Sequence, residues 1–328
     1  MTCALFIGEM LIDFIPHLPG LDGVICYQPH PGGAVANAAV ALARLGGAAR
    51  FVGKLSEDGF GKLLLRTLQE NGVDTRFVPL TSRGNTALAL VTLQEEGRPE
   101  FTFYRQGTAD TLLEASDLTR EVWQDVTLCH AGSVLLASEP ARSATLAALE
   151  QAHLRGLLVS FDVNVRPLLW ASQAEIRALL AQVVERVDLL KFSAEEAHYL
   201  DPALTEPLNP VDGPRLRELG QKLLDRGPSL VVITRGPLGA LLLTRQQSVE
   251  AVGVPLQALD TTGAGDAFMG ALLYKLMQQN WPDASQLAAL PSRTLQEFGE
   301  FANRAAGLSC TRYGGIASLP LLAELERS

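Results

Sequence analysis

Short apolar runs alternate with amphipathic stretches along most of this chain of 328 residues. The runs at residues 3–7, 50–53, 128–132, 157–162, 189–192 and 230–234 are almost wholly apolar, as strands buried on both faces are. Residues 59–71, 141–154, 174–186 and 216–226 have helical spacing, and Ser172 with Glu175 predicts a capping box. The alternation predicts an α/β fold with a doubly wound, mostly parallel sheet flanked by helices, and with ligands at the carboxyl ends of its strands.

Two stretches, residues 13–30 and 85–106, break this alternation. They carry β-branched and aromatic residues at strand spacing, with no helical segment inside them. We therefore expect them to form a small second β-sheet. Because no internal repeat or long linker is visible and 47% of the residues are hydrophobic, residues 1–328 are expected to form a single domain that includes this small sheet.

Composition limits the class of partner. A net charge of −9 and a pI near 5.1 argue against nucleic acid and against an acidic membrane surface, since phosphate groups favour clustered Lys and Arg. The four cysteines form no Cys-x-x-Cys pair and the five histidines show no metal-ligand spacing, so neither disulfides nor a zinc site is indicated. The lack of a signal segment and of a membrane-length apolar run predicts a cytoplasmic protein.

The segment 260–266, with the sequence DTTGAGD, has the pattern of an anion-binding turn with a base attached. Gly263, Ala264 and Gly265 leave backbone N–H groups uncovered at the start of a predicted helix, where the helix dipole also favours an anion. The same dipole is expected to keep Asp266 ionised, so that its carboxylate can accept a proton from an attacking alcohol. The alternative is an ordinary helix start, with the preceding threonine as its N-cap.

A second glycine-led turn occurs more than two hundred residues earlier. The segment 31–46 places Gly32 and Gly33 before an Ala-rich helix, with Asn37 one turn inside it. Glycines there allow the backbone to approach a ligand closely, and an asparagine amide can donate to and accept from sugar hydroxyls. The alternative is a helix of small residues packed tightly against a sheet.

Together these segments resemble the paired signatures of the ribokinase-like (PfkB-type) carbohydrate kinases, and the resemblance extends over nearly the whole chain. Residues 8–14, 103–105, 161–170, 191–196 and 301–303 look like the fructokinase branch of that family, in the same order and spacing. The resemblance implies a ribokinase-like fold and transfer of the γ-phosphoryl group of ATP to a sugar hydroxyl. It also implies that the small sheet is a lid over the sugar, and that a homodimer forms through it.

The resemblance assigns residues on the substrate side. The candidates are Asp13, Gly32, Gly33, Asn37, Arg105 and Arg166. Asp13 would accept from two sugar hydroxyls, and its alternative role is that of a turn carboxylate. The alternative for each arginine is an ordinary surface residue whose side chain is exposed to solvent.

The resemblance also assigns nucleotide and metal residues. Thr234, Gly236, Gly239 and Asn303 would lie along ATP, with Arg235 near the phosphates, while Asn164 and Glu196 would organise hydrated Mg²⁺ through water. The usual family pattern Asn-x-x-Glu here begins with Ser193, which is also a plain capping box and weakens the metal role of Glu196. Asp260 and Thr262, with residues 312–315, would hold K⁺.

The mechanism implied is in-line transfer from ATP, with Asp266 as base and the amides of Gly263, Ala264 and Gly265 holding the developing charge. Fructose is the first acceptor considered. A 2-keto-3-deoxygluconate kinase, which would use Arg105 and Arg166 for the substrate carboxylate, and an aminoimidazole riboside or other nucleoside kinase are the alternatives. A sugar-sensing pseudokinase would tend to lose Asp266, and a nicotinamide-dependent dehydrogenase would need a Gly-x-Gly-x-x-Gly motif after the first strand, where none occurs.

Overall fold

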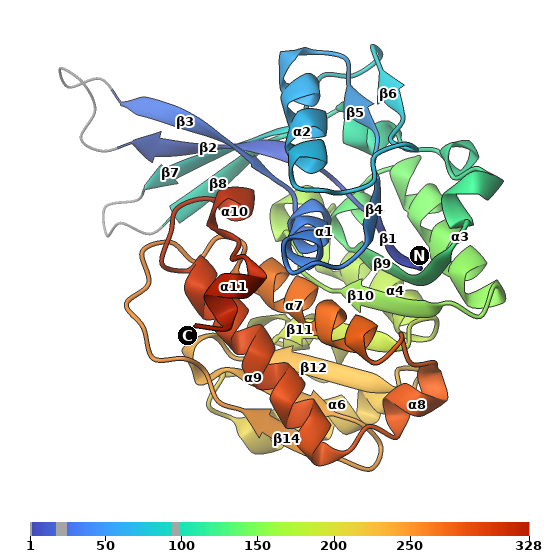
Figure 1. Ribbon diagram of the computed structural model, residues 1–328, viewed down its shortest axis with the longest axis vertical. Coiled ribbons are helices and arrows are strands. Elements are labelled where there is room, and N and C mark those ends of the chain that lie inside the picture. Colours follow the sequence, from blue (N-terminus) through green and yellow to red (C-terminus); the bar gives the residue numbers. More distant parts are fainter. Residues whose placement is uncertain (1, 18–24, 94–98, 328) are drawn as a thin grey trace.

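The computed structural model describes residues 2–17, 25–93 and 99–327. Its centre is an eight-stranded sheet in the order β14-β13-β12-β11-β10-β9-β1-β4 (Figure 1). These strands are β1 (Cys3–Ile7), β4 (Ala49–Val52), β9 (Val126–Gly132), β10 (Leu158–Asp162), β11 (Leu189–Ser193), β12 (Leu230–Thr234), β13 (Ala240–Leu243) and β14 (Ser248–Ala251). All six predicted strands are therefore present. They are neighbours in the sheet, from β4 at one edge to β12, and each pairs in parallel with the next.

The sheet ends in two antiparallel strands that the sequence pattern did not predict. β12 pairs with β13, and β13 with β14, both antiparallel. These connections are hairpins and not helical crossovers, so no amphipathic helix separates the three strands. The alternation of apolar runs and helices therefore could not reveal β13 and β14. The predicted class, a mostly parallel doubly wound sheet, is confirmed.

Helices cover both faces of the main sheet (Figure 1). Alternate residues of one strand face opposite cores: Phe6 of β1 belongs to the core under α1, α7 and α9, and Leu5 to the core under α3, α4 and α6. The long helices are α1 (Ala34–Arg44), α2 (Gly59–Glu70), α3 (Ala141–Leu154), α4 (Gln173–Val184), α6 (Gly213–Leu224), α7 (Ala264–Gln278) and α9 (Ser292–Ser309). The short ones are α5 (Ala197–Leu200), α8 (Ala284–Ala288), α10 (Gly315–Ser318) and α11 (Leu322–Leu325).

Helices α1 and α7 meet along a seam of small residues. A Cβ atom on Gly270 of α7 would lie 2.4 Å from the Cβ of Ala41 and 2.7 Å from the carbonyl oxygen of Ala38, both on α1. Only glycine fits such a close approach of two backbones. The seam therefore fixes the spacing of the two helices whose first turns carry the sequence signatures.

A separate four-stranded sheet projects from one side of the molecule (Figure 1). Its order is β3-β2-β7-β8, with β2 (Leu11–His17), β3 (Cys26–Gly32), β7 (Leu88–Leu93) and β8 (Pro99–Tyr104). The predicted small sheet is confirmed, although residues 18–24 and 94–98 of the two predicted stretches lie outside the described residues. A third, two-stranded pairing joins β5 (Leu55–Ser56) to β6 (Leu80–Thr81).

The helix boundaries follow the expected start signals with two differences. Ser172 accepts from the backbone N–H of Glu175 at 3.2 Å, but Glu175 bonds Ala171 and Arg142 in return, so only half of the predicted capping box forms. Helix α6 begins three residues before the predicted start, because Asp212 caps it.

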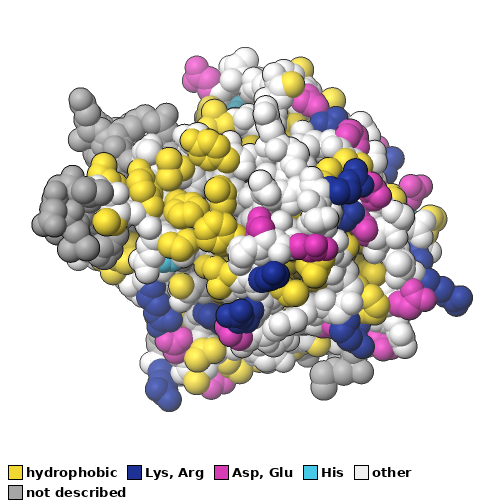
Figure 2. Space-filling view, turned by 90° about the horizontal axis from the view of Figure 1, so that it is seen from above, with side chains coloured by type: hydrophobic (Ala, Val, Ile, Leu, Met, Phe, Trp, Pro, Cys, Tyr) yellow, Lys and Arg dark blue, Asp and Glu magenta, His cyan; other side chains and the backbone are white. Residues whose placement is uncertain are grey.

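The surface in Figure 2 divides by type: apolar side chains gather over the half that carries the small sheet, and charged ones lie over the rest. Over the described ranges, no helix combines the length and the apolar character needed to cross a membrane.

Candidate active site

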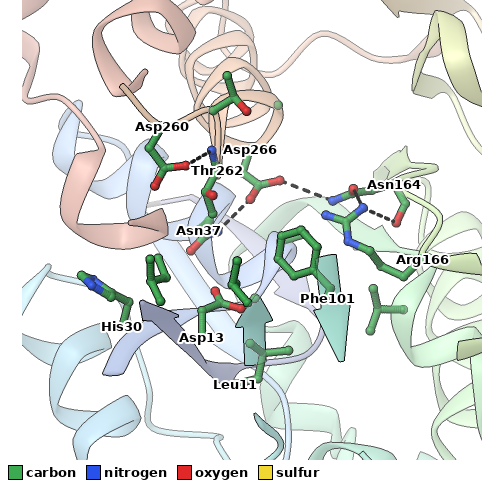
Figure 3. A pocket seen from close by; sticks show the side chains of 18 of the residues that line it. Leu11, Asp13, His30, Asn37, Phe101, Asn164, Arg166, Asp260, Thr262 and Asp266 are labelled. Carbon is green, nitrogen blue, oxygen red and sulfur yellow. Dashed lines mark hydrogen bonds between the residues drawn. The ribbon is translucent and has the colours of Figure 1, made fainter. Parts of the chain in front are cut away.

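A cavity of about 900 Å³ lies between the small sheet and the carboxyl ends of the main-sheet strands (Figure 3). Its walls come from the small sheet (Leu11, Asp13, Val91, Phe101, Phe103), the start of α1 (Gly33, Ala34, Asn37), the loops after β9 and β10 (Val134, Asn164, Arg166), the turn before α7 (Asp260, Thr261, Thr262, Gly263) and the first turn of α7 (Gly265, Asp266). Ligands of open α/β sheets bind at this edge, as the sequence pattern predicts.

Both helices that start at the cavity begin at a glycine with positive φ. The N-cap of α1 is Gly33, with φ 118°, and that of α7 is Gly263, with φ 78°. A Cβ on Gly33 would lie 2.4 Å from the carbonyl oxygen of Glu9, so the backbone itself excludes larger residues. Neither helix has a side-chain cap, which rules out Thr262 as the N-cap of α7.

The anion turn offers fewer free amides than its sequence indicates. The N–H of Ala264 donates to the carbonyl of Thr261 at 3.2 Å, while those of Gly263 and Gly265 have no acceptor in the described part of the chain. Asp260 braces the turn from behind, because its two carboxylate oxygens accept from the N–H groups of Thr262 (2.9 Å) and Gly314 (2.8 Å). The turn is therefore preorganised to bind an anion through its glycine amides.

Asp266 lies at the first turn of α7, buried beside two asparagines that the sequence analysis assigned to other roles. Its Oδ2 accepts from Asn37 Nδ2 at 2.7 Å, and its Oδ1 lies 3.5 Å from Asn164 Nδ2 (Figure 3). Burial raises the pKa of Asp266 to about 6, against the lowering effects of the Asn37 hydrogen bond and of the Lys191 and Arg166 charges. The expected stabilisation of the anion by the helix dipole does not prevail, yet the carboxylate remains mostly ionised at neutral pH.

The opposite wall of the cavity is rich in hydrogen-bond acceptors. Asp13 points into it from β2, and a Cβ on Gly32 would lie 2.3 Å from Asp13 Oδ2, so a larger residue there would displace this carboxylate. Glu9, which the sequence analysis did not single out, is buried, with its Oε1 accepting from Ala34 N at 2.7 Å. Burial raises the pKa of each of these two carboxyl groups to about 7. Asn37 Oδ1 and Glu9 Oε2 find no partner among the described residues.

The two candidate arginines differ in their position relative to the cavity. Arg166 lines the cavity and donates to Asn164 Oδ1 at 2.5 Å. Arg105 is buried and donates through Nε to Asp110 Oδ2, also at 2.5 Å, and it borders a smaller hollow instead of the main cavity. Arg166 therefore lines the main cavity and Arg105 does not, although burial's effect on the pKa of the cavity residue Glu9 is partly offset by the Arg105 charge, which lowers that pKa.

Lys191 and Asp162 form a buried ion pair that the sequence analysis gave no role. Lys191 Nζ donates to both carboxylate oxygens of Asp162, at 2.9 and 2.7 Å, and it lines the cavity. A signal was available, since Lys191 is a charged residue inside an otherwise apolar, buried run.

The metal candidates lie close to this pair. Glu196 accepts from Val165 N at 2.6 Å and from Ser193 N at 2.8 Å, the second bond being half of the predicted capping box. Asn164, with φ 31°, lines the cavity. Within the described ranges, no group of three or more His, Cys, Asp or Glu side chains could hold a metal ion by itself.

The four predicted nucleotide residues border a different region from the main cavity. Thr234 ends β12, and Gly236 and Gly239 have φ 56° and 90° in the turn that follows. Asn303 donates to the carbonyls of Ala251 (2.9 Å) and Val252 (3.0 Å), which fixes the end of β14. Arg235 is buried and donates to Glu250 and to the carbonyl of Leu238.

Comparison with known proteins gives one consistent family. A model described as the pfkB family carbohydrate kinase matches residues 1–322. Fructokinase-1 of Oryza sativa subsp. japonica and Fructokinase-1 of Zea mays are each 39% identical over 320 residues, covering 97% of this chain and 94% of theirs.

Solved structures agree. A fructokinase with bound ATP from Xylella fastidiosa has a TM-score of 0.88 at 32% identity, over 99% of this chain and 97% of that one. Aminoimidazole riboside kinase from Salmonella enterica, solved with aminoimidazole riboside and an ATP analogue, has a TM-score of 0.81 at 28% identity, over 99% of each chain. The predicted resemblance is confirmed, and this chain belongs to the pfkB family of carbohydrate kinases.

Proposed function

We propose that this chain is an ATP-dependent fructokinase, which transfers the γ-phosphoryl group of ATP to a hydroxyl of fructose. The observation that carries the proposal is the 2.7 Å hydrogen bond between Asn37 and Asp266, which joins a sugar-side amide to a base at the mouth of an anion turn. Among its relatives, a Vibrio cholerae fructokinase solved with fructose, ADP and potassium has a TM-score of 0.85 at 32% identity, over 100% of this chain and 98% of that one.

Asp266 acts as the base in this mechanism. It accepts the proton of the attacking hydroxyl, whose oxygen bonds to the γ-phosphorus while the bond to ADP breaks. A pKa of about 6 suits the task, because the group is ionised at neutral pH and is still a stronger base than an ordinary aspartate. The N–H groups of Gly263 and Gly265 donate to the charge that develops on the phosphoryl oxygens.

The small sheet acts as a lid in the same proposal. Its inner face presents Phe101 and Phe103 to the cavity, opposite the turn that carries Asp266. Apolar rings at this position exclude water, which would otherwise compete with the sugar for the phosphoryl group.

Bound together with ATP, magnesium would neutralise phosphate charge during the transfer. Asn164 and Glu196 fit a hydrated ion held through water, since Glu196 already accepts two backbone N–H groups and a carboxylate retains further lone pairs. Asp260 and Thr262 would hold potassium behind the turn that they already brace. Thr234, Gly236, Gly239 and Asn303 would border the nucleotide.

The acceptor is a neutral sugar in this proposal. Asp13 and Glu9 make the acceptor wall acidic, and Arg105, which a kinase for a sugar acid would use, donates to Asp110 and does not line the cavity. Arg166 remains the cavity arginine and donates to neighbouring amide and carbonyl oxygens. Hydroxyl groups donate to carboxylates and to the free Asn37 Oδ1, whereas a substrate carboxylate would be repelled.

An acceptor panel tests the proposal. ATP consumption is measured with fructose, ribose, 2-keto-3-deoxygluconate and aminoimidazole riboside, and fructose is expected to give the highest kcat/KM. If 2-keto-3-deoxygluconate were used about tenfold better, a difference of about 1.4 kcal/mol in transition-state binding, the fructose assignment would be wrong and the transfer mechanism would stand. Preference for aminoimidazole riboside would instead place the chain with the Salmonella enterica kinase that it resembles.

A further inference from the structure

The Lys191–Asp162 pair has no part in the proposed mechanism, yet Lys191 lines the cavity. Both side chains are only 5% exposed, and the ammonium contacts both carboxylate oxygens. Two of the three ammonium hydrogens are therefore used by Asp162. No other acceptor for Lys191 occurs among the residues that the structure describes, which leaves one donor for whatever the cavity binds.

The ammonium lies directly beside the anion turn. A Cβ placed on Gly265 would be 3.3 Å from Lys191 Nζ, so the glycine leaves room for the charge at the point where its own N–H is free. Lys191 comes from the middle of β11 and Gly265 from the start of α7, so two different elements direct positive charge to one spot. A site of this kind favours an anion more strongly than helix-end amides alone.

A contribution to folding stability does not explain why the Lys191–Asp162 ion pair is buried. Taking two charges out of water costs free energy that their mutual attraction often fails to recover, and well-packed apolar residues at such positions are often as stable or more so. Burial by itself lowers the pKa of Lys191, but the Asp162 carboxylate overrides this effect and, with the nearby Glu196 and Asp266, raises it, so the side chain is a cation. His130 below it is buried and neutral, because burial lowers its pKa to about 3.

We propose that Lys191 is a further catalytic residue that donates a hydrogen bond to a γ-phosphoryl oxygen of ATP, and that Asp162 is the positioning residue that holds it there. The inference rests on the proposed phosphoryl transfer. Lys191 stays protonated throughout, while the proton of the sugar hydroxyl goes to Asp266 and ADP leaves. Its ammonium contacts the phosphoryl group before, during and after the transfer.

Nucleotide binding tests the contact without requiring turnover. Calorimetry on Lys191→Met should show binding of the non-hydrolysable analogue AMP-PNP weakened by at least about tenfold, as expected for a lost charge-assisted bond, and ADP binding within about twofold of the wild type. ADP has no γ-phosphoryl group to contact. Equal weakening of both nucleotides, or of neither, would overturn the proposal, and this readout stands even if the acceptor panel finds no substrate.

A paired variant separates catalysis from folding. Lys191→Met leaves Asp162 buried and unpaired, so it should lower Tm and reduce kcat by about 10²-fold. The double variant Asp162→Asn/Lys191→Met removes the unpaired charge, and we expect it to recover Tm but not kcat. Recovery of kcat to within about threefold of the wild type would show that the role is structural.

The chain offers a matched control. Lys54 and Asp117 form another largely buried pair, with 2.7 Å between Nζ and Oδ2, and neither residue lines the cavity. Lys54→Met should lower Tm in the same way while kcat and AMP-PNP binding stay at the wild-type values. A comparable loss of AMP-PNP binding in this control would contradict the assignment to Lys191.

Discussion

The two ends of the cavity are built from opposite chemistry. At the acceptor end, the carboxyl groups of Asp13 and Glu9 are buried, which raises both pKa values to about 7. At the turn end, the free N–H groups of Gly263 and Gly265 and the ammonium of Lys191 provide only donors. One end suits hydroxyl groups and rejects anions, whereas the other attracts an anion.

Asp266 lies at the boundary between these ends. It begins the helix of the donor end, but its Oδ2 accepts from Asn37, which belongs to the acceptor end. A phosphoryl-transfer site can thus separate its two substrates by placing hydrogen-bond acceptors at one end and donors at the other. The base then lies where the two ends meet.

Removing the base should have the largest effect. Asp266→Asn is nearly isosteric and cannot accept the proton, so kcat should fall by at least about 10²-fold while the dissociation constants for sugar and nucleotide change little. Steady-state kinetics and calorimetry provide these values. Asp212→Asn, at the N-cap of α6 and outside the cavity, is the control and should keep the wild-type kcat. Near-normal turnover of Asp266→Asn would show that Asp266 is not the catalytic base.

Removing an acceptor-wall carboxylate should affect one substrate only. Asp13→Ala is expected to reduce kcat/KM for fructose by about 10- to 100-fold, the range for a lost hydrogen bond to a charged group, and to leave KM for ATP unchanged. The measurement is a pair of KM determinations, one with each substrate varied. A similar rise in both KM values would show that the two ends are not independent.

Acidification should inactivate the enzyme through its base. Asp266 is active when ionised and its pKa is raised to about 6, so kcat/KM should be constant above about pH 7, where Asp13 and Glu9 are ionised too, and fall by at least about tenfold per unit below about pH 6. A profile from pH 5 to 9 checks this, and activity that stays flat down to pH 5 would contradict the raised pKa.

The smallest effect concerns stability. The folded-state pKa of Asp13 is about 7 and therefore above its unfolded value, so the folded protein binds that proton more tightly and loses stability as pH rises from about 4 through 7. Asp13→Asn should raise Tm of the ligand-free protein at pH 8, by roughly 2 °C per kcal/mol relieved, and not at pH 4. A lower Tm at pH 8 would mean that the carboxylate is stabilised in the folded state.

The sequence predicted what depends on local chemistry. Glycines at 33 and 263 lead into helices because no other residue accepts those φ values cheaply, and the turn they make is visible in the chain itself. The two polar groups on these helices, Asn37 and Asp266, were found for the same reason. Their direct contact across 229 positions was not, because only the packing of α1 on α7 creates it.

What depends on burial and on partners could not be predicted. The pKa of Asp266 shifts upward because of packing by distant elements, which outweighs the local dipole that the sequence shows. Arg105 carries the expected motif position, yet Asp110, five residues later, engages it. Lys191 lay within a recognised motif, but its partner Asp162 is on the neighbouring strand, 29 residues away.

The seam between α1 and α7 has a consequence for how this protein can diversify. Gly270 and Ala41 hold the two helices so close that Asn37 and Asp266 cannot separate without moving both backbones. The small sheet, by contrast, contributes Leu11, Val91, Phe101 and Phe103 to the cavity from outside this seam. Descendants can therefore exchange lid side chains and acquire new acceptors while inheriting the catalytic spacing intact, and an engineer who wishes to change the acceptor should mutate the lid and leave the seam alone.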